Sequence, residues 1–330
     1  MTEEGDTLAK VRGLRVGVAT DEKEETGVSV VLFPQTGRGA VEVRGGAPGT
    51  YHTDGLGLRG AMGRIHALFF SGGSLYGLDA ARGIRRLVLD VGGGTPLWGA
   101  RTPLVSISGA VIFDLPRNRE LAVDYEELGY RAALAASAKP VPSGRVGAGR
   151  GARVGKLNGS KLAMQGGQGS SARKIPGGYS VGALAILNAV GNVIDPSSGK
   201  ILAGARASRG KGWATKADLL RRWSHLKELE RARGTVLVLV ATDAPATRWD
   251  LNRMARAGND AVARCVSPAH MASDGDISFA VTTNRDVPLW PRGEEAPYPG
   301  ALADLLGFAA EEAVIEAIVR AVARSAPDPR

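Results

Sequence analysis

The sequence predicts a mixed α/β or α+β fold, in which short buried strands alternate with amphipathic helices. One observation is an unbroken apolar run over residues 235–242, which is typical of a fully buried strand. A second is the helical spacing of apolar residues in segments such as 251–262, which lie between such strands. The 46 glycines follow no repeat period, so they favour many tight turns in a globular chain of 330 residues.

Short apolar runs bounded by turn residues mark the expected strands. The charged stretch 21–25 separates the first two runs, and the glycine-rich stretch 45–49 follows the third. The glycine-dense stretch 144–169 is expected to be mostly loop or tight strand pairs. The expected strands are residues 16–18, 28–33, 40–44, 67–70, 110–113, 181–187, 235–242 and 277–282.

Helical periodicity marks the segments between these strands. Residues 216–230 predict an amphipathic helix with a basic outer face, and residues 301–323 predict one or two helices. Because we find no linker and no internal repeat, we expect a single domain over residues 1–330. The remaining expected helices lie around residues 78–84, 126–137 and 251–262.

Composition and charge argue against several classes of protein. The formal net charge is +9, but the 42 basic residues are widely spread, aromatic residues make up only 5%, and no zinc-finger or RNA-binding motif occurs. We therefore expect no nucleic-acid partner. No apolar run approaches the ~18 residues of a membrane helix, so no membrane association is expected. The acidic, polar residues 1–6 do not resemble a signal peptide, and the single cysteine, Cys265, fits a reducing cytoplasm.

Thr235 is the strongest candidate for a catalytic residue. It follows Gly234 and opens the buried apolar run. If the chain were cut before Thr235, its new α-amine, with a pKa near ~8, would lie beside its own hydroxyl and serve as its base. The alternative is an ordinary strand start, since threonine favours strands and glycine favours turns.

Four other polar residues can complete such a site. Asn188 ends a buried strand, where its amide can donate a hydrogen bond to a developing oxyanion. Asp274 and Asp276 flank one glycine, so both carboxylates can reach one site from a turn. Lys156 follows the glycine-dense stretch, which can bring it close to other backbone. The simpler alternatives are a turn cap for Asn188, solvated turn residues for the aspartates and a surface charge for Lys156.

No cofactor or metal motif is complete. Residues 147–152 match a dinucleotide-binding fingerprint formally, but they lack a clear preceding strand and a helix-forming continuation. Residues 150–156 resemble a phosphate-binding loop, yet Arg150 stands where its first glycine belongs. The four histidines, His52, His66, His225 and His270, lack metal-ligand spacing. We therefore expect neither a metal nor an organic cofactor.

A series of short motifs lies in order along residues 14–284. The motifs are VRGGAPGT (43–50), SGGSLYGLDAA (71–81), GAVIFDL (109–115), GRVGAGRGA (144–152), VGK (154–156), LNAVG (187–191), GT (234–235), VATDA (240–244) and DGD (274–276) followed by FA (279–280). Together they resemble the L-aminopeptidase/D-esterase family of self-cleaving N-terminal-nucleophile hydrolases. This family includes β-aminopeptidases and nylon-oligomer hydrolases, and the nylon-oligomer branch looks nearest.

The resemblance implies a fold and a processing event. The implied fold is an αββα sandwich of the L-aminopeptidase/D-esterase type. The family's precursor cuts itself before its nucleophile, which falls here on Thr235 and leaves an α-fragment of residues 1–234 and a β-fragment of residues 235–330. The two fragments are expected to stay associated and to form a homotetramer.

The resemblance also assigns roles to the other site residues. It implies that Asn188 stabilises the oxyanion and that Lys156 lies near the nucleophile, where its charge would lower the pKa of the new amine. The acidic pair of the nylon-oligomer branch falls on Asp274 and Asp276, which would orient Lys156 or the amine. The aminopeptidase branch tends to have serine and glutamate at these two positions.

Two positions depart from the family pattern. The residue before the nucleophile is often asparagine in related chains, but here it is Gly234, as in some aminopeptidase members. A tyrosine common near the site falls on Phe113, which cannot donate a hydrogen bond. Tyr76 is a candidate to supply that hydroxyl, and both residues are possible parts of a substrate pocket.

Three functions follow from these inferences. The leading one is an amide hydrolase that releases N-terminal residues from peptides or small amides, as an aminopeptidase does. The second is an endo-hydrolase of 6-aminohexanoate (nylon) oligomers, which the acidic pair favours. The third, from another class, is an acyl transferase of the ornithine acetyltransferase type, which the quoted motifs match less well.

Overall fold

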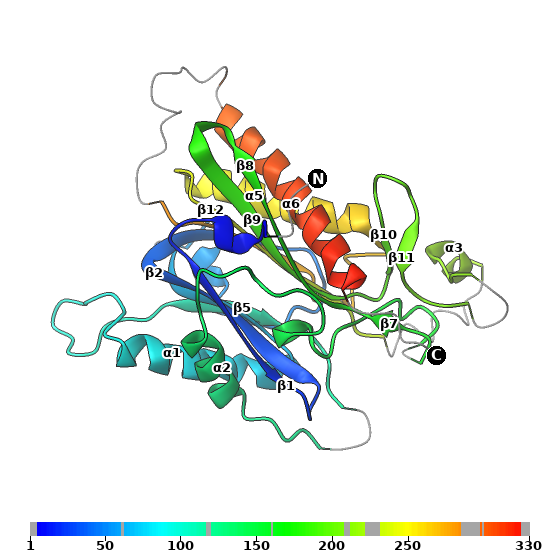
Figure 1. Ribbon diagram of the computed structural model, residues 1–330, viewed down its shortest axis with the longest axis horizontal. Helices are drawn as coiled ribbons and strands as arrows, with labels where there is room; N and C mark the ends of the chain where they lie inside the picture. The colour runs from blue at the N-terminus through cyan, green and yellow to red at the C-terminus, as the bar shows by residue number, and fades with distance from the viewer. Residues whose placement is uncertain are drawn as a thin grey trace.

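The computed structural model describes residues 5–60, 63–116, 120–159, 161–207, 212–221, 232–284, 298 and 300–324. Within these residues the main sheet has nine strands, in the order β3-β5-β4-β2-β14-β12-β9-β8, with β1 paired to β2. Helices α1 (Ala80–Asp90) and α2 (Tyr125–Leu134) cover one outer side of the strands, and helices α5 (Arg248–Cys265) and α6 (Ala301–Ala323) cover the other (Figure 1). The nine strands are β1 (Arg15–Asp21), β2 (Thr26–Val43), β3 (Thr50–Tyr51), β4 (Arg64–Ser71), β5 (Ile107–Val111), β8 (Gly167–Ile175), β9 (Tyr179–Asn188), β12 (Thr235–Thr242) and β14 (Ile277–Thr282).

The long strand β2 joins the two halves of the sheet. Its first part pairs with β1 and β4, and its last part, residues 38–43, pairs with β14. The sequence predicted two strands here, 28–33 and 40–44, and this separation is wrong. The register with β4 shifts between Leu32 and Gly37, so the polar stretch between the two apolar runs is an irregularity inside one strand.

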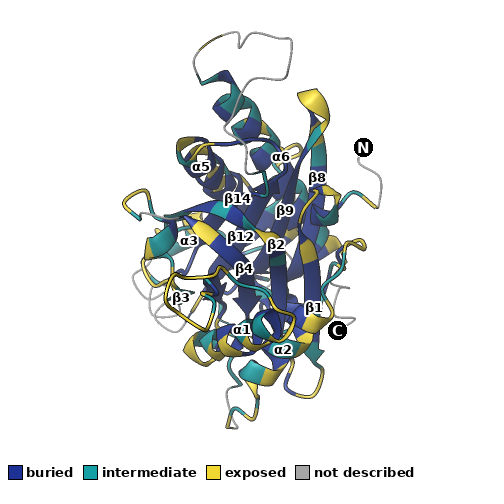
Figure 2. Cartoon of the chain, turned by 90° about the vertical axis from the view of Figure 1, so that its left-hand side faces the viewer, coloured by how far each residue is buried: buried dark blue, intermediate teal, exposed yellow. Residues whose placement is uncertain are grey.

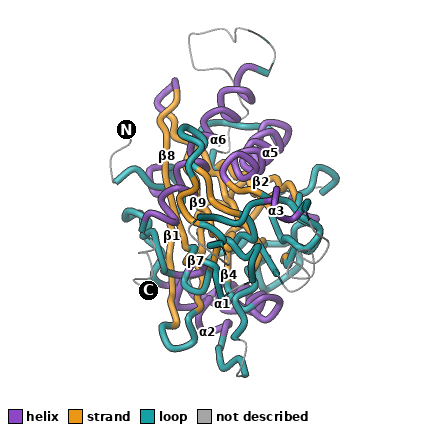
Figure 3. The backbone as a smooth tube through the Cα atoms, turned by 90° about the vertical axis from the view of Figure 1, so that its right-hand side faces the viewer, coloured by secondary structure: helices purple, strands orange, loops and turns teal. Residues whose placement is uncertain are grey.

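Three apolar clusters explain the layers. One lies between helices α5 and α6 and the strands β9, β12 and β14. The second joins β1, β2 and β4 to β9, β12 and β14, so the two halves of the sheet pack face to face. The third lies between the first half and helices α1 and α2. Figure 2 shows the resulting buried centre, and Figure 3 shows the strands between the two helical layers. The expected αββα sandwich is therefore present.

The helices agree with the periodicity of the sequence. Helix α5 begins at a capping box in which Thr247 and Asp250 exchange side-chain and backbone hydrogen bonds. The stretch 301–323 forms one helix, α6, and not two. Of the helix predicted over 216–230, the structure describes only its start, because residues 222–230 lie outside the described part. The helices are α1 (Ala80–Asp90), α2 (Tyr125–Leu134), α3 (Lys216–Leu219), α5 (Arg248–Cys265) and α6 (Ala301–Ala323).

Strand β8 is the main element that the sequence analysis did not predict. Its serines are buried polar residues, and their hydroxyls donate to backbone carbonyls, Ser170 to Ala183 and Ser171 to Ala313. A side chain at Gly169 would come within 1.9 Å of the Ala317 carbonyl oxygen of α6. Small residues therefore let α6 pack directly on β8, and the strand has no apolar pattern to reveal it.

The shorter elements connect these layers. A three-stranded sheet has the order β11-β10-β13, and β6 pairs with β7. No helix in the described part of the chain is long and apolar enough to cross a membrane. These elements are β6 (Arg153–Val154), β7 (Met164–Gln165), β10 (Asn192–Ile194), β11 (Ile201–Ala203), β13 (Val266–Ser267), and the 3₁₀ helices η1 (Leu8–Lys10), η2 (Asp54–Leu56), η3 (Ser74–Asp79), η4 (Gly147–Gly149) and η5 (Pro176–Gly178).

Candidate active site

The predicted site residues meet at one edge of the sheet. Strands β12 and β14 are parallel, so both begin at this edge, and the antiparallel β9 ends there. Thr235 and Asn188 are direct partners in the register of β12 and β9. The aspartates precede or begin next to β14, and Lys156 reaches Asn188 from the segment after β6. All five residues are between 1% and 7% exposed.

Thr235 lies against the peptide bond that it would cut. Its Oγ1 donates a hydrogen bond of 2.5 Å to the carbonyl oxygen of Gly234. The same oxygen accepts a 2.9 Å hydrogen bond from the backbone N–H of Gly275. A hydroxyl close to a carbonyl that is already polarised by an N–H donor is the arrangement that an acyl transfer to the hydroxyl needs.

Position 234 has room for glycine alone. A Cβ there would lie 2.5 Å from Asp274 Oδ1 and 2.8 Å from the backbone nitrogen of Val190. The Val190 nitrogen belongs to the backbone, so it cannot move aside as the end of a flexible side chain can. The departure from the asparagine of many related chains therefore has a local packing reason in this protein.

Lys156 binds the backbone on both sides of the site. Its Nζ donates to the carbonyl oxygen of Asn188 at 2.9 Å, to Asn188 Oδ1 at 2.8 Å and to the carbonyl oxygen of Arg233 at 2.7 Å. The preceding Gly155 has a φ of +73°, and a Cβ on it would meet the carbonyl carbon of Gly204 at 1.9 Å. This close backbone approach is what the glycine-dense stretch was expected to provide.

Asn188 lies in the site, but the hydrogen bonds of its side chain go to groups other than the Gly234 carbonyl oxygen. Its Nδ2 donates to the carbonyl oxygen of Phe113 at 3.2 Å, and its Oδ1 accepts from the backbone nitrogen of Arg153 at 3.0 Å as well as from Lys156. The Gly234 carbonyl oxygen instead accepts from the Gly275 N–H and from Thr235 Oγ1. The Gly275 N–H is therefore the backbone donor on this carbonyl. The sequence analysis missed this donor, because a backbone N–H carries no residue signature.

The two aspartates have different surroundings. Asp276 Oδ1 accepts a 2.7 Å hydrogen bond from the backbone nitrogen of Val236, and its Oδ2 accepts from the backbone nitrogen of His270 at 2.9 Å. Asp274 Oδ2 accepts from the backbone nitrogen of Met271 at 2.9 Å, but its buried Oδ1 has no hydrogen-bond partner among the described residues. Asp276 thus fixes the start of β12 directly after Thr235, whereas Asp274 keeps an acceptor available.

Burial, followed by the charge of Asp276, raises the pKa of Asp274 from its ordinary value to about 6. The Met271 N–H and the charge of Lys156 act in the opposite direction. A buried carboxyl group with an unpaired oxygen is costly unless a cation or a donor arrives. Such a group beside a reactive peptide bond is a functional candidate on electrostatic grounds.

The glycine-rich stretch 45–49 supports this acidic loop from behind. The backbone nitrogens of Arg44 and Gly45 donate to the Asp276 carbonyl oxygen at 3.0 Å, and that of Ala47 donates to the Asp274 carbonyl oxygen at 2.8 Å. A Cβ on Gly45 would lie 2.2 Å from the Asp274 carbonyl oxygen. The motif after β2 therefore shapes the loop that carries both aspartates.

His270 is a member of the site that the sequence analysis did not select. Its Nδ1 lies 3.0 Å from Asp276 Oδ2, and its Nε2 lies 3.1 Å from the carbonyl oxygen of Asn259 in α5. The only available signal was its position six residues before Asp276.

The two predicted pocket residues lie on adjacent elements. Phe113 follows β5 and is 45% exposed, and its carbonyl oxygen contacts Asn188. Tyr76 is 62% exposed on η3, and the first residue of η3, Ser74, donates its backbone N–H to the Ile112 carbonyl oxygen. Both side chains are exposed on neighbouring elements, and their contact with substrate stays a prediction.

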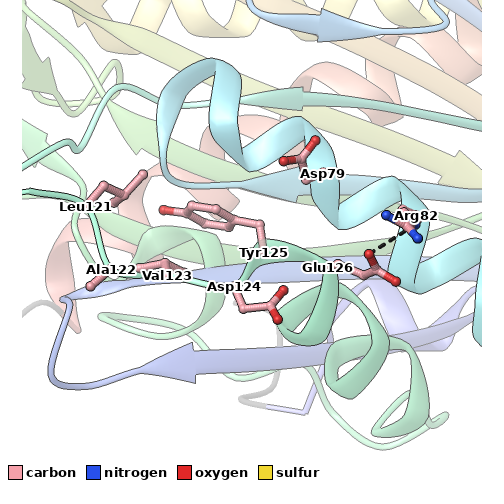
Figure 4. A pocket seen from close by; sticks show the side chains of 8 residues that line it. All are labelled: Asp79, Arg82, Leu121, Ala122, Val123, Asp124, Tyr125 and Glu126. Atoms are coloured by element: carbon pink, nitrogen blue, oxygen red, sulfur yellow. Dashed lines mark ion pairs between the residues drawn. The ribbon is translucent and has the colours of Figure 1, made fainter.

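A hollow of about 570 Å³ opens elsewhere, between the start of α1 and the segment before α2 (Figure 4). An ion pair of 3.1 Å between Arg82 and Glu126 crosses it. None of the Thr235-site residues lines this hollow, so it gives no support to a function at that site. Its lining residues are Asp79, Arg82, Leu121, Ala122, Val123, Asp124, Tyr125 and Glu126.

No group of three or more His, Cys, Asp or Glu side chains in the described part of the chain has a geometry that could hold a metal ion. Near Thr235 the acidic side chains instead bind a histidine and backbone N–H groups, and the charge of Lys156 acts on Asp274. The chemistry that these residues can perform is nucleophilic attack by a hydroxyl on an amide carbonyl, assisted by fixed donors and charges.

Comparison with known proteins gives a family and several relatives. Residues 6–327 of the chain match the model of Peptidase family S58. An uncharacterized aminopeptidase of Mycobacterium tuberculosis (strain ATCC 25618 / H37Rv) is 36% identical, over 98% of this chain and 95% of the relative. A 6-aminohexanoate-oligomer endohydrolase of Kocuria sp. (strain KY2) is 30% identical, over 94% of this chain and 84% of the relative. The likeness to an endohydrolase is therefore real but no stronger than the likeness to an aminopeptidase.

Two solved structures share the fold. The Burkholderia sp. beta-aminopeptidase has a TM-score of 0.63 at 22% identity, over 97% of this chain and 87% of that chain. The L-aminopeptidase D-Ala-esterase/amidase from Ochrobactrum anthropi has a TM-score of 0.63 at 20% identity, over 97% of this chain and 86% of that chain. The latter is described as a new variant among the Ntn hydrolase fold. These likenesses confirm the fold class that the motifs implied.

Proposed function

Since the chain belongs to Peptidase family S58, we propose that it is an autoprocessed N-terminal threonine amide hydrolase that releases N-terminal residues from peptides or small amides. The single observation that carries this proposal is the Thr235 hydroxyl, 2.5 Å from the carbonyl oxygen of Gly234 at the start of a buried strand. The mycobacterial relative, named an aminopeptidase, supports the same reaction class.

Self-cleavage begins with attack of Thr235 Oγ1 on the Gly234 carbonyl carbon. The developing oxyanion keeps its hydrogen bond from the Gly275 N–H, and collapse of the intermediate breaks the Gly234–Thr235 C–N bond and leaves an ester. The released amine takes up a proton, and water hydrolyses the ester. The products are residues 1–234 and a fragment that begins with Thr235.

The cut changes what the buried charges face. Lys156 holds the Arg233 carbonyl oxygen in the intact chain, and departure of residues 233–234 lets a substrate carbonyl replace it. The unpaired Asp274 Oδ1 points to the space beside Gly234, next to where the new Thr235 amine emerges. Asp274 thus orients the amine, while the charge of Lys156 disfavours its protonation and keeps it a base.

In the mature enzyme, the Thr235 hydroxyl attacks the amide carbonyl of the substrate and the α-amine takes its proton. Asn188 donates to the oxyanion once its amide turns from the Phe113 carbonyl oxygen, and removal of such a donor costs about 3–4 kcal/mol in comparable sites. Water then hydrolyses the acyl-enzyme. Phe113 and Tyr76 form one wall of the substrate pocket in this proposal.

Endo-hydrolysis of 6-aminohexanoate oligomers is the second candidate. It is favoured by the Kocuria relative, a 6-aminohexanoate-oligomer endohydrolase, together with the Asp274–Asp276 pair in this chain. An aminopeptidase requires a free amino end on its substrate, whereas an endo-hydrolase accepts a blocked one.

The proposal also covers how the cleaved fragments stay together and assemble. The cleaved fragments stay together, because β12 lies between β9 and β14 inside the sheet and its removal would expose two apolar clusters. We propose a homotetramer of these cleaved units in the cytoplasm, with a peptide or amide as the only partner in catalysis.

Two measurements test the proposed function, the intact mass of the protein and its turnover of substrates. Intact mass spectrometry of freshly purified and aged protein should show a 34.3 kDa chain converting to fragments of about 24 and 10 kDa, in proportion to their lengths. Turnover should appear in step with cleavage on L-alanine and β-alanine p-nitroanilides or on a 6-aminohexanoate oligomer. Each substrate is also assayed with its amino end acetylated, and loss of turnover on acetylation identifies an aminopeptidase. An uncut chain with full activity contradicts the proposal.

A further inference from the structure

A chain of hydrogen bonds links the strand of the nucleophile to a histidine. The backbone N–H of Val236, the residue after Thr235, donates to Asp276 Oδ1 at 2.7 Å. The other oxygen of Asp276 accepts from the His270 backbone N–H at 2.9 Å and lies 3.0 Å from its Nδ1. One carboxylate therefore joins Val236 to His270 across the base of the site.

The surroundings of His270 require a charged ring. Its Nδ1 faces the Asp276 carboxylate and its Nε2 faces the Asn259 carbonyl oxygen at 3.1 Å, and both of these partners are acceptors. An imidazole can satisfy two acceptors only when both ring nitrogens carry protons. The pair is largely withdrawn from water, since the side chains of His270 and Asp276 are 16% and 2% exposed.

The backbone holds His270 in the same arrangement. His270 has a φ of +58°, which a non-glycine residue adopts rarely. In this conformation both its ring and its N–H reach the same carboxylate oxygen. The loop thus binds Asp276 Oδ2 through His270, while the backbone N–H of Val236 donates to Asp276 Oδ1.

The charged groups around the ring have opposing effects on its pKa. Burial alone lowers the pKa of His270, but the hydrogen bond and the charge of Asp276 outweigh it, and the net direction is upward. Arg44, the residue after β2, acts to lower it and is itself paired with Asp260 of α5 at 2.6 Å. Asp274 also couples to His270 through charge. His270 therefore keeps its proton to a higher pH than an imidazole without these partners.

We propose that His270 is a positioning residue for catalysis: as an imidazolium it holds the Asp276 carboxylate against the Val236 N–H, fixes the position of Thr235, and sets an alkaline limit of activity where it loses its proton. The inference rests on the proposed function for its catalytic consequence, but the His270–Asp276 pair itself can be tested without any turnover.

The first measurement is independent of activity. In the uncut Thr235→Ala protein, NMR titration of the histidine rings, assigned with His270→Asn, should give a His270 pKa above the ordinary 6.5. Asp276→Asn should bring it below that value, because burial then acts without the carboxylate. A His270 pKa at or below 6.5 with Asp276 intact overturns the proposal, whatever the enzyme does.

The second measurement is the pH profile of kcat/KM. His270→Asn keeps a residue that tolerates positive φ but removes the charge. Below the His270 pKa the variant should be slower than the wild type by about 10²-fold, the scale of a displaced catalytic group. Above that pKa the two profiles should converge, because the wild-type ring is then neutral as well. A constant ratio at all pH values would reveal a purely structural role and overturn the proposal.

Two controls separate folding from positioning. His270→Gln replaces His270→Asn if the asparagine variant does not fold. Its kcat/KM profile should likewise converge with that of the wild type above the His270 pKa. His66→Gln changes a buried histidine of β4 that bonds Thr95 and Ser106 away from the site, and its profile should match the wild type. If wild-type protein neither cuts itself nor turns over substrate, the proposed function fails, while the NMR titration still decides the state of His270.

Discussion

The two ends of β12 carry the same kinds of side chain and use them in opposite ways. At the far end, Thr242 Oγ1 donates to the Ser180 carbonyl oxygen at 2.8 Å and accepts from the Ala244 N–H at 3.0 Å. Asp243 there accepts from the Ser180 N–H at 2.7 Å and pairs with Arg12 at 2.6 Å. At the near end, Thr235 faces its own peptide bond and Asp274 keeps a buried oxygen without a partner.

The difference shows how a buried polar cluster becomes reactive. Every polar atom of the Thr242–Asp243 end has a hydrogen-bond partner, so that end ties β12 to β9 and has little reason to change. The Thr235 end holds a hydroxyl beside a polarised carbonyl and an acceptor with no partner among the described residues, which costs stability. In the proposed self-cleavage, the new Thr235 amine would satisfy this acceptor.

The largest expected effect is at Thr235. Thr235→Ala should leave a single uncut chain and lower turnover by at least about 10³-fold, because it removes the nucleophile of both steps. The fold should persist, since the change costs only about 1 kcal/mol of stability. Intact mass and turnover measure this, and substantial turnover by folded, uncut Thr235→Ala would place the nucleophile elsewhere.

Gly234 should come next. Gly234→Ala forces a Cβ to within 2.5 Å of Asp274 Oδ1 and should slow self-cleavage by about 10²-fold through displacement of the scissile carbonyl. The matched control is Gly5→Ala, where a Cβ meets no atom within 4 Å. The time course of fragment appearance compares the two, and equal rates would show that the tight fit is unimportant.

Asp274 and Asp243 should respond in opposite directions. In uncut Thr235→Ala protein, a folded pKa of about 6 against an ordinary 3.8 means that Asp274 destabilises the fold as pH rises through this interval. Asp274→Asn should therefore add up to about 3 kcal/mol to the free energy of unfolding at pH 8 and nothing below about pH 4. Denaturant unfolding at the two pH values measures this.

Asp243→Asn is the counterpart at the far end of β12. It loses the pairing with Arg12 and should lower the free energy of unfolding by about 1 kcal/mol. If both aspartate variants change stability in the same direction, the contrast between the two ends is wrong.

Thr242 should affect stability alone. Thr242→Ala removes two buried hydrogen bonds and should cost about 1–3 kcal/mol of unfolding free energy. Cleavage and kcat should stay at wild-type levels, because the change lies at the opposite end of the strand. A drop in kcat without a change in stability would link the two ends.

The smallest expected effect is that of a chelator. EDTA should change neither turnover nor the rate of self-cleavage, because in our proposal Asp274 and Asp276 act through charge; their hydrogen bonds go to His270 and backbone donors. Loss of activity on EDTA treatment that added metal restores would make the two aspartates metal ligands instead.

The sequence by itself determined the buried strands, the long helices and the set of candidate site residues. Continuous apolar runs and helical spacing are local signals, so β9, β12, β14, α5 and α6 could all be predicted within a few residues of their ends. Thr235, Asn188, Lys156 and the two aspartates were selected because each stands beside a strand end or a glycine. The structure brings all five together at one edge of the sheet.

Only the tertiary structure decided how these residues are connected. The Gly275 N–H on the scissile carbonyl and the grip of His270 on Asp276 depend on which backbone groups meet across strands, and side-chain patterns do not encode that. Strand β8 was hidden for a related reason, because its small polar residues become buried only when α6 packs on them. Residue type shows what chemistry is possible, but long-range backbone contacts, which cost chain entropy and form only with the whole fold, decide which atoms react.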